Sequence, residues 1–120
     1  MFKNEVAEFI YKRTYSRWLE NENRREDWPE TIERFISFII SERPDIPEKT
    51  QEKIRKYMTE FAVMPSMRFL WAAGPAAKAD NTCIYNCAFA PIDDWRVFSE
   101  VMFLLLGGTG IVILAIILDR

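Results

Sequence analysis

The sequence predicts an α+β fold in which a helical first half precedes a strand, a helix and a second strand. The charge distribution is the first indication, because 25 of the 34 charged side chains lie in residues 1–60. Apolar residues recur there at the three- and four-residue spacing of surface helices. Residues 61–120 instead contain short apolar runs interrupted by glycine and proline, a pattern typical of buried strands and the turns between them.

Three helices are expected in the first half, over residues 3–19, from Trp28 to about residue 40, and over residues 47–62. The middle helix has the clearest start, because Asp27 can cap it and Glu30 completes a variant of the capping box. The apolar faces of the three helices predict a helical core. The residues on these faces are Val6, Phe9, Ile10, Trp18, Trp28, Ile32, Phe35, Ile36, Ile39, Ile40, Ile54, Tyr57, Met58 and Phe61.

The second half is expected to begin with a buried strand over residues 82–90. A turn at residues 91–94 follows, and then a helix that ends at the glycine-rich residues 107–110. The run Ile111–Leu118 is rich in β-branched residues and predicts a core strand. A fully buried strand needs neighbours on both edges, and the sequence shows no evident partner for this last strand.

Residues 101–118 carry no charge and approach the length of a membrane span. Gly107, Gly108 and Gly110 interrupt this stretch, and glycines at its middle favour a turn between a helix and a strand. The alternative that stays open is a small helical protein without catalysis, anchored to a membrane by residues 101–118.

Composition excludes several classes of protein. The net charge is −2, so there is no basic excess to neutralise the phosphates of a nucleic acid. The chain has no histidine, which removes Ser-His and Cys-His nucleophile pairs and every histidine-ligated metal site. Two cysteines cannot complete a zinc site of thiolates, so no metal site is expected. Charged side chains among the first 20 residues leave no secretory signal core, and we expect a cytoplasmic location.

Two short motifs are weak when each is taken alone. Cys83 and Cys87 are four positions apart, which matches neither a thioredoxin-type pair nor a radical-type iron–sulfur motif. The spacing favours two ordinary buried thiols, although one of them could act as a redox donor if a partner cysteine came from elsewhere. The segment Gly107–Gly110 lacks the lysine of a phosphate-binding P-loop and favours a simple turn, although its backbone amides could approach a ligand.

Taken together, six motifs in a fixed order resemble one family. The sequence resembles the N-terminal part of the adenosylcobalamin-dependent (class II) ribonucleotide reductases, of the monomeric ribonucleoside-triphosphate reductase type. The resemblance extends from about residue 5 to residue 110. The motifs are Tyr15-Ser16-Arg17, Asn23-Arg24-Arg25-Glu26-Asp27-Trp28, Pro65-Ser66-Met67-Arg68, Ala73-Gly74-Pro75, Asn81-Thr82-Cys83-x-Tyr85-Asn86-Cys87 and Gly108-Thr109-Gly110.

The resemblance implies a domain organisation. Residues 1–63 correspond to an N-terminal helical domain, and residues 64–110 to the start of the catalytic barrel. The expected fold is therefore an α+β fragment: a helical domain followed by the first strand and helix of a ten-stranded α/β barrel, then truncated. Residues 111–120 form an apolar tail that departs from the family, which continues Val-Gly-Phe-Ser at this point.

The resemblance also implies an activity. Such enzymes convert ribonucleoside triphosphates to deoxyribonucleotides by thiyl-radical chemistry, with a cysteine pair as the reductant. The implied cofactor is adenosylcobalamin, whose binding region is not in this chain. The implied partners are the ribonucleoside triphosphate substrate, a dNTP effector and a thioredoxin-type reductant.

Individual residues acquire expected roles from the same resemblance. Cys87 matches one of the two reducing cysteines, on the first strand of the barrel. Ser66, Asn86 and Gly110 match positions that bind substrate. The effector site is expected to begin at Asp93 or Asp94, and Cys83 is expected to be a bystander.

The radical-bearing cysteine and the second reducing cysteine of the family are expected downstream of this chain, which is therefore expected to be inactive alone. One account is a truncated or interrupted reductase gene. Another is a split enzyme whose remaining part is a second chain that covers the apolar surface of residues 101–118.

Overall fold

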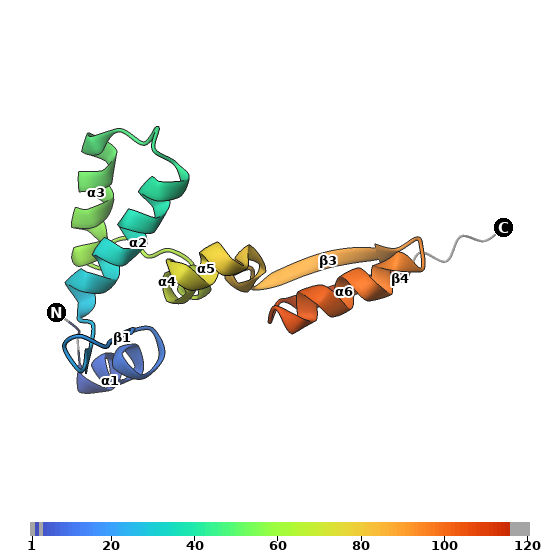
Figure 1. Ribbon diagram of the computed structural model, residues 1–120, viewed down its shortest axis with the longest axis horizontal. Coiled ribbons are helices and arrows are strands. Elements are labelled where there is room, and N and C mark those ends of the chain that lie inside the picture. The colour runs from blue at the N-terminus through green and yellow to red at the C-terminus, as the bar shows by residue number, and fades with distance from the viewer. Residues whose placement is uncertain (1, 3, 116–120) are drawn as a thin grey trace. The chain divides into compact units, whose positions relative to one another are not determined.

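The computed structural model describes residue 2 and residues 4–115, and its ribbon is drawn in Figure 1. The chain divides into two compact units. Unit 1 extends to Gly74, and unit 2 begins at Pro75. The predicted domain boundary after residue 63 stays a prediction.

Unit 1 contains four helices and a small hairpin among its described residues. The helices are α1 (Glu5–Thr14), α2 (Trp28–Glu42), α3 (Glu48–Thr59) and α4 (Met67–Ala72). Strands β1 (Trp18–Leu19) and β2 (Arg24–Arg25) pair antiparallel between α1 and α2. The capping box predicted for α2 is confirmed, because the Asp27 side chain accepts from the Glu30 backbone N–H and the Glu30 side chain accepts from that of Asp27.

The core of unit 1 lies mainly on the predicted face of α2. Its buried members are Tyr11, Trp28, Ile32, Phe35, Ile36, Met58, Leu70 and Ala73. The prediction for the first helix is partly wrong. Val6, Phe9 and Ile10 are exposed, and Tyr11 is the residue of α1 that enters the core. The helix also ends at Thr14 rather than residue 19, because the chain turns there into the hairpin strand that contains Trp18.

Unit 2 is built around one strand–helix–strand motif. Helix α5 (Pro75–Ala79) and the 3₁₀-helix η1 (Asn81–Ile84) lead into β3 (Cys87–Ile92), α6 (Arg96–Leu106) and β4 (Gly110–Ala115). Strands β3 and β4 are parallel and pair in register from Cys87 opposite Gly110 to Ile92 opposite Ala115. Helix α6 contacts both strands.

The structure corrects two expectations for this half of the chain. The strand predicted over residues 82–90 begins at Cys87, because residues 81–84 turn into η1 with Asp80 as the cap. None of the residues of β3 is buried. The second strand does have a partner, namely β3, which the sequence left unassigned. Residues 116–120 of the predicted tail lie outside the described residues.

The uncharged stretch from residue 101 is divided between two elements. Its first part completes α6, which ends at Leu106, and its next part forms β4 from Gly110. Among the described residues, no helix is both long enough and apolar enough to span a membrane.

Candidate functional site

Three of the predicted site residues lie at one edge of the two-stranded sheet. Cys87 is the first residue of β3, and Gly110, the first residue of β4, is its partner in the register. The Gly110 backbone N–H donates to the Asn86 carbonyl oxygen at 2.9 Å. Because the strands are parallel, both begin at the same edge. The thiol-bearing residue, the asparagine and the glycine are therefore brought together.

A buried threonine fixes the turn that leads into β4. The side chain of Thr109 is directed to the carbonyl oxygens of Thr82 at 3.3 Å and Tyr85 at 3.4 Å. Asp80 in turn accepts from the backbone N–H and the hydroxyl of Thr82, at 2.9 and 2.8 Å. These bonds, that of the backbone N–H first, lower the pKa of Asp80. The segment before Cys87 is thus tied to the segment before Gly110.

Two glycines of this turn differ in what surrounds them. A Cβ atom at Gly107 would lie 2.5 Å from the Thr82 hydroxyl oxygen, so a larger residue there would force the Thr82 side chain to shift. A Cβ at Gly110 would meet the Asn86 carbonyl oxygen at 3.5 Å and the Cys87 sulfur at 3.9 Å, which are ordinary contacts. The described atoms therefore leave room above Gly110 on the side of the thiol.

The two cysteines are both free thiols but differ in exposure. Cys87 is exposed and Cys83 is half-buried. A thiol that exchanges with an external reductant must be reachable by it. Of the two thiols, that of Cys87 is therefore the more reachable.

The remaining predicted site residues lie elsewhere along the chain. Ser66 belongs to unit 1, where its hydroxyl accepts from the Phe69 backbone N–H and caps α4. Asp93 and Asp94 lie in the bend between β3 and α6, and the carboxylate of Asp94 accepts from the Arg96 backbone N–H at 3.2 Å.

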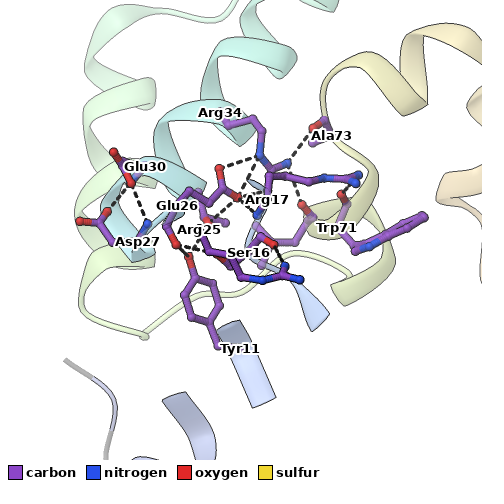
Figure 2. Close-up of polar contacts among 12 residues, drawn as sticks. Tyr11, Ser16, Arg17, Arg25, Glu26, Asp27, Glu30, Arg34, Trp71 and Ala73 are labelled. Carbon is purple, nitrogen blue, oxygen red and sulfur yellow. Dashed lines mark hydrogen bonds and ion pairs between the residues drawn. The ribbon is translucent and has the colours of Figure 1, made fainter. Parts of the chain in front are cut away.

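Unit 1 also contains a buried polar cluster that the sequence did not predict, and Figure 2 shows it. Its centre is Glu26, whose carboxylate accepts from Arg34 Nη2 at 2.7 Å and from the Thr31 hydroxyl at 2.8 Å. The Arg17 backbone N–H donates to the same carboxylate at 3.0 Å. The Glu26 side chain is 3% exposed and that of Arg34 17%. Glu26 lies in one of the family motifs, but nothing in the sequence pattern distinguishes it from a surface glutamate.

The cluster shifts the pKa values of two of its members. Burial alone would raise the pKa of Glu26, but the hydrogen bonds from Arg34, Thr31 and the Arg17 backbone outweigh it and hold the pKa below its ordinary value. Burial raises the pKa of Tyr11 to about 12, and the nearby charge of Glu26 adds to this shift. The Tyr11 hydroxyl is hydrogen-bonded to that of Thr31.

Within the part of the chain that the structure describes, neither the region around Cys87 and Gly110 nor the Glu26 cluster contains a group of metal ligands. Among residue 2 and residues 4–115, no group of three or more histidine, cysteine, aspartate or glutamate side chains is placed to hold a metal ion.

Comparison with known proteins gives a consistent result. Residues 1–75 match the family model of the ribonucleotide reductase alpha domain. A putative adenosylcobalamin-dependent ribonucleoside-triphosphate reductase of Mycobacterium phage D29 is 40% identical over 85 residues, which cover 68% of this chain and 12% of the relative. The adenosylcobalamin-dependent ribonucleoside-triphosphate reductase of Lactobacillus gasseri is 33% identical over 100 residues, covering 73% of this chain and 13% of that protein.

A solved structure that resembles this chain comes from the same family. The crystal structure of a B12-dependent (class II) ribonucleotide reductase superposes with a TM-score of 0.73 at 27% identity, over 88% of this chain and 19% of that one. The chain thus spans about an eighth of the length of the curated relatives it matches.

Proposed function

Because the chain belongs to the ribonucleotide reductase family, as its match to the alpha-domain model shows, we propose that it supplies the N-terminal segment of an adenosylcobalamin-dependent ribonucleoside-triphosphate reductase. The observation that carries this proposal is the pairing of the exposed Cys87 with Gly110 at the start of two parallel strands. An accessible thiol is held there beside an open backbone position.

Cys87 is the proposed redox residue. In the overall reaction, a ribonucleoside triphosphate and a dithiol give a deoxyribonucleoside triphosphate, a disulfide and water. A thiyl radical removes the 3′ hydrogen and later returns it, and the 2′ oxygen leaves as water. Two thiols supply two electrons and two protons as their sulfurs bond to each other. Cys87 provides one of these thiols, and a thioredoxin-type reductant regenerates it by thiol–disulfide exchange.

The substrate is proposed to lie against Asn86 and Gly110. The space left above Gly110 supports this placement, because the chain's own packing gives no reason for glycine there. Ser66 is proposed to contribute a hydrogen bond to the same nucleotide. Asp93 and Asp94 are proposed to begin the dNTP effector site.

The proposal extends to the architecture. Residues 1–63 form the helical domain and residues 64–110 begin a ten-stranded barrel, of which β3 and α6 are the first strand and helix. The remainder of the enzyme, whether encoded with this segment or as a second chain, supplies the radical-bearing cysteine and the second reducing cysteine. The 120-residue chain alone is therefore proposed to be inactive, and the assembled enzyme to work in the cytoplasm.

The cavity found in unit 1 is not suited to holding the cofactor. This apolar cavity of about 560 Å³ is lined mainly by aromatic, methionine and aliphatic side chains, with few partners for the many amide groups of a cobalamin. We therefore assign no residue of this chain to adenosylcobalamin, which supplies the radical when it is bound.

The test is a chimeric reductase in which residues 1–110 of this chain replace the matching segment of the Lactobacillus gasseri relative. We expect Cys87→Ser to abolish thioredoxin-dependent turnover, because serine cannot form the disulfide. Cys83→Ser is the matched control and should leave turnover unchanged. Full turnover in the Cys87→Ser chimera would refute the proposed role of Cys87.

A further inference from the structure

We propose that the Glu26 cluster is a positioning device for Ser66, acting through helix α4. This inference rests on the function proposed for Ser66, and it assigns a task to a buried polar group that the redox chemistry does not use. Glu26, Arg34 and Arg17 are positioning residues, because they act on Ser66 through α4 and not on the substrate directly.

Arg34 joins α2 to the C-terminal end of α4. Its Nη1 atom donates to the carbonyl oxygens of Leu70 at 3.1 Å and Ala73 at 2.7 Å. On its other side, Nη2 and Nε donate to the Glu26 carboxylate. A guanidinium suits this position because its donors are fixed in one plane and can serve a carboxylate and carbonyls at the same time.

Arg17 provides a second attachment to the same helix end. Its side chain donates to the Trp71 carbonyl oxygen, and its guanidinium lies 4.8 Å from the centre of the Trp71 ring. The backbone N–H of Arg17 donates to Glu26, so one carboxylate orients both arginines. Figure 2 shows Arg17 and Arg34 converging on the chain at Trp71 and Ala73.

These contacts occupy carbonyls that a helix cannot satisfy by itself. The last four carbonyls of a helix have no partner within it, and those of Leu70 and Trp71 are among them in α4. The turn that follows is also held, because Arg34 donates to the Ala73 carbonyl oxygen just before it. In this turn Gly74 has a φ of +114°, a conformation that favours glycine. The end of α4 is therefore fixed in space as well as hydrogen-bonded.

Ser66 lies at the N-terminal end of α4, one helical turn before Leu70. The helix has only six residues, and the Ser66 carbonyl accepts from the Leu70 backbone N–H at 2.9 Å. Leu70 is fully buried, and its own carbonyl is held by Arg34. A displacement of the fixed end is therefore passed on to Ser66, which caps the N-terminal end of α4.

The first experiment is hydrogen exchange on the 120-residue chain. Arg34→Lys keeps a cation beside Glu26 but replaces the planar, five-donor guanidinium, which spans the carboxylate and both carbonyls, with a compact ammonium. We expect faster exchange at the amides of Leu70 and Ala73, at least tenfold, with the amides of α2 and α3 unchanged. The matched control is Arg55→Lys, because Arg55 makes an exposed ion pair with Glu33 between α3 and α2. Unchanged exchange in α4 of Arg34→Lys would overturn the inference.

Arg17→Ala keeps the test decisive if Arg34→Lys prevents folding. It removes the side-chain attachment to Trp71 and leaves the Glu26–Arg34 ion pair in place. Faster exchange confined to α4 is expected again. Protection equal to that of the unsubstituted chain would contradict the inference, as would a loss spread evenly over unit 1.

The second experiment separates this inference from the proposed function. In the chimeric reductase, Ser66→Ala is expected to raise the KM for the ribonucleoside triphosphate about tenfold, the usual effect of losing one hydrogen bond. Arg34→Lys should also raise KM with little change in kcat, and the double variant should be no worse than the more affected single variant. If the increases in KM of the two single variants add in full in the double variant, positioning through Ser66 is overturned. If α4 loosens while Ser66→Ala leaves KM unchanged, the substrate role of Ser66 is refuted and the mechanical coupling stands.

Discussion

Units 1 and 2 use apolar residues in opposite ways. Unit 1 is rich in charge, yet it buries Trp28 to 7% exposure and Ile32 to 1%. Unit 2 has few charges, yet Trp95 is 86% exposed and Leu106 80%. Apolar content therefore does not decide burial. Burial requires a second apolar face at the right distance, which α2 finds in the other helices of unit 1.

The difference follows from the kind of element in each unit. Each of the helices α1–α4 has one apolar face to bury, and the helices bury these faces by packing against one another. A parallel sheet needs cover on both faces. Among the described residues of unit 2, α6 contacts the strands, while Phe89 and Val112 stay exposed. The same comparison holds for two carboxylates: Glu26 of unit 1 is enclosed with its partners, whereas Asp94 of unit 2 is at the surface.

The largest expected effect comes from opening the buried cluster of unit 1. Glu26→Ala leaves Arg34 desolvated without its carboxylate, which typically costs 3–5 kcal/mol of unfolding free energy. Urea unfolding of the 120-residue chain measures it. The matched control is Glu33→Ala, which breaks the exposed pair with Arg55 and should cost under about 1 kcal/mol. Equal costs would mean that the cluster is not buried in solution.

An aliphatic truncation in each unit sharpens the contrast in packing. Ile36 is 3% exposed in the core of unit 1, so Ile36→Ala should cost roughly 2–5 kcal/mol. Leu106 is exposed on α6, and Leu106→Ala should change the free energy of unfolding by less than about 0.5 kcal/mol. A cost below about 1 kcal/mol for Ile36→Ala in urea melts would contradict the assignment of α2 to a core.

Acid should weaken unit 1 through Glu26. The folded-state pKa of this carboxyl lies below its ordinary value of 4.5, so the ionised form is favoured by folding. The stability that it contributes is complete above pH 4.5 and is lost as the pH falls through the lower, folded-state pKa. Glu26→Gln should flatten part of the pH dependence of unfolding below pH 4.5. Some dependence should persist, because hydrogen bonds from Arg24 and the Asp27 backbone lower the pKa of Glu30 to about 2.

The pH dependence is measured by urea unfolding at a series of pH values, on the unsubstituted chain and on Glu26→Gln. Parallel curves for the unsubstituted chain and Glu26→Gln, offset by a constant, would show that Glu26 has the same pKa in the folded and unfolded states. That result would contradict the charge-assisted bonds seen around it.

The elements of the chain were predictable where local chemistry decides them. The start of α2 followed from Asp27 and Glu30, because a capping box is complete within four residues. The pairing of β3 with β4 was not predictable, since parallel strands are joined through a helix and their register depends on distant contacts. The face of α1 was wrong because the partner of Tyr11 is Thr31, twenty positions away.

The candidate site shows the same limit. Cys87, Asn86 and Gly110 were identified by their place in motifs, and the structure shows the three to be neighbours. The Glu26 cluster could not be found in this way. A glutamate between an arginine and an aspartate in sequence gives no sign of burial. Its partner Arg34 lies eight positions further on, and the carbonyls of Leu70 and Ala73, which Arg34 also holds, come from a distant part of the chain.

The smallest expected effect compares the helix caps of the two units. Asp27→Ala removes the side-chain acceptor for the Glu30 backbone N–H at the start of the 15-residue helix α2, and should cost about 0.5–2 kcal/mol. Asp80→Ala removes the equivalent cap from the four-residue η1 in unit 2. Its cost in global unfolding should be smaller, because η1 has little core to hold in place. Its effect should appear instead as faster hydrogen exchange at the Thr82 amide, because the Thr82 backbone N–H donates to the Asp80 carboxylate. A larger loss of unfolding free energy for Asp80→Ala than for Asp27→Ala would reverse the comparison and would make unit 2, rather than unit 1, the more cooperative part of the chain.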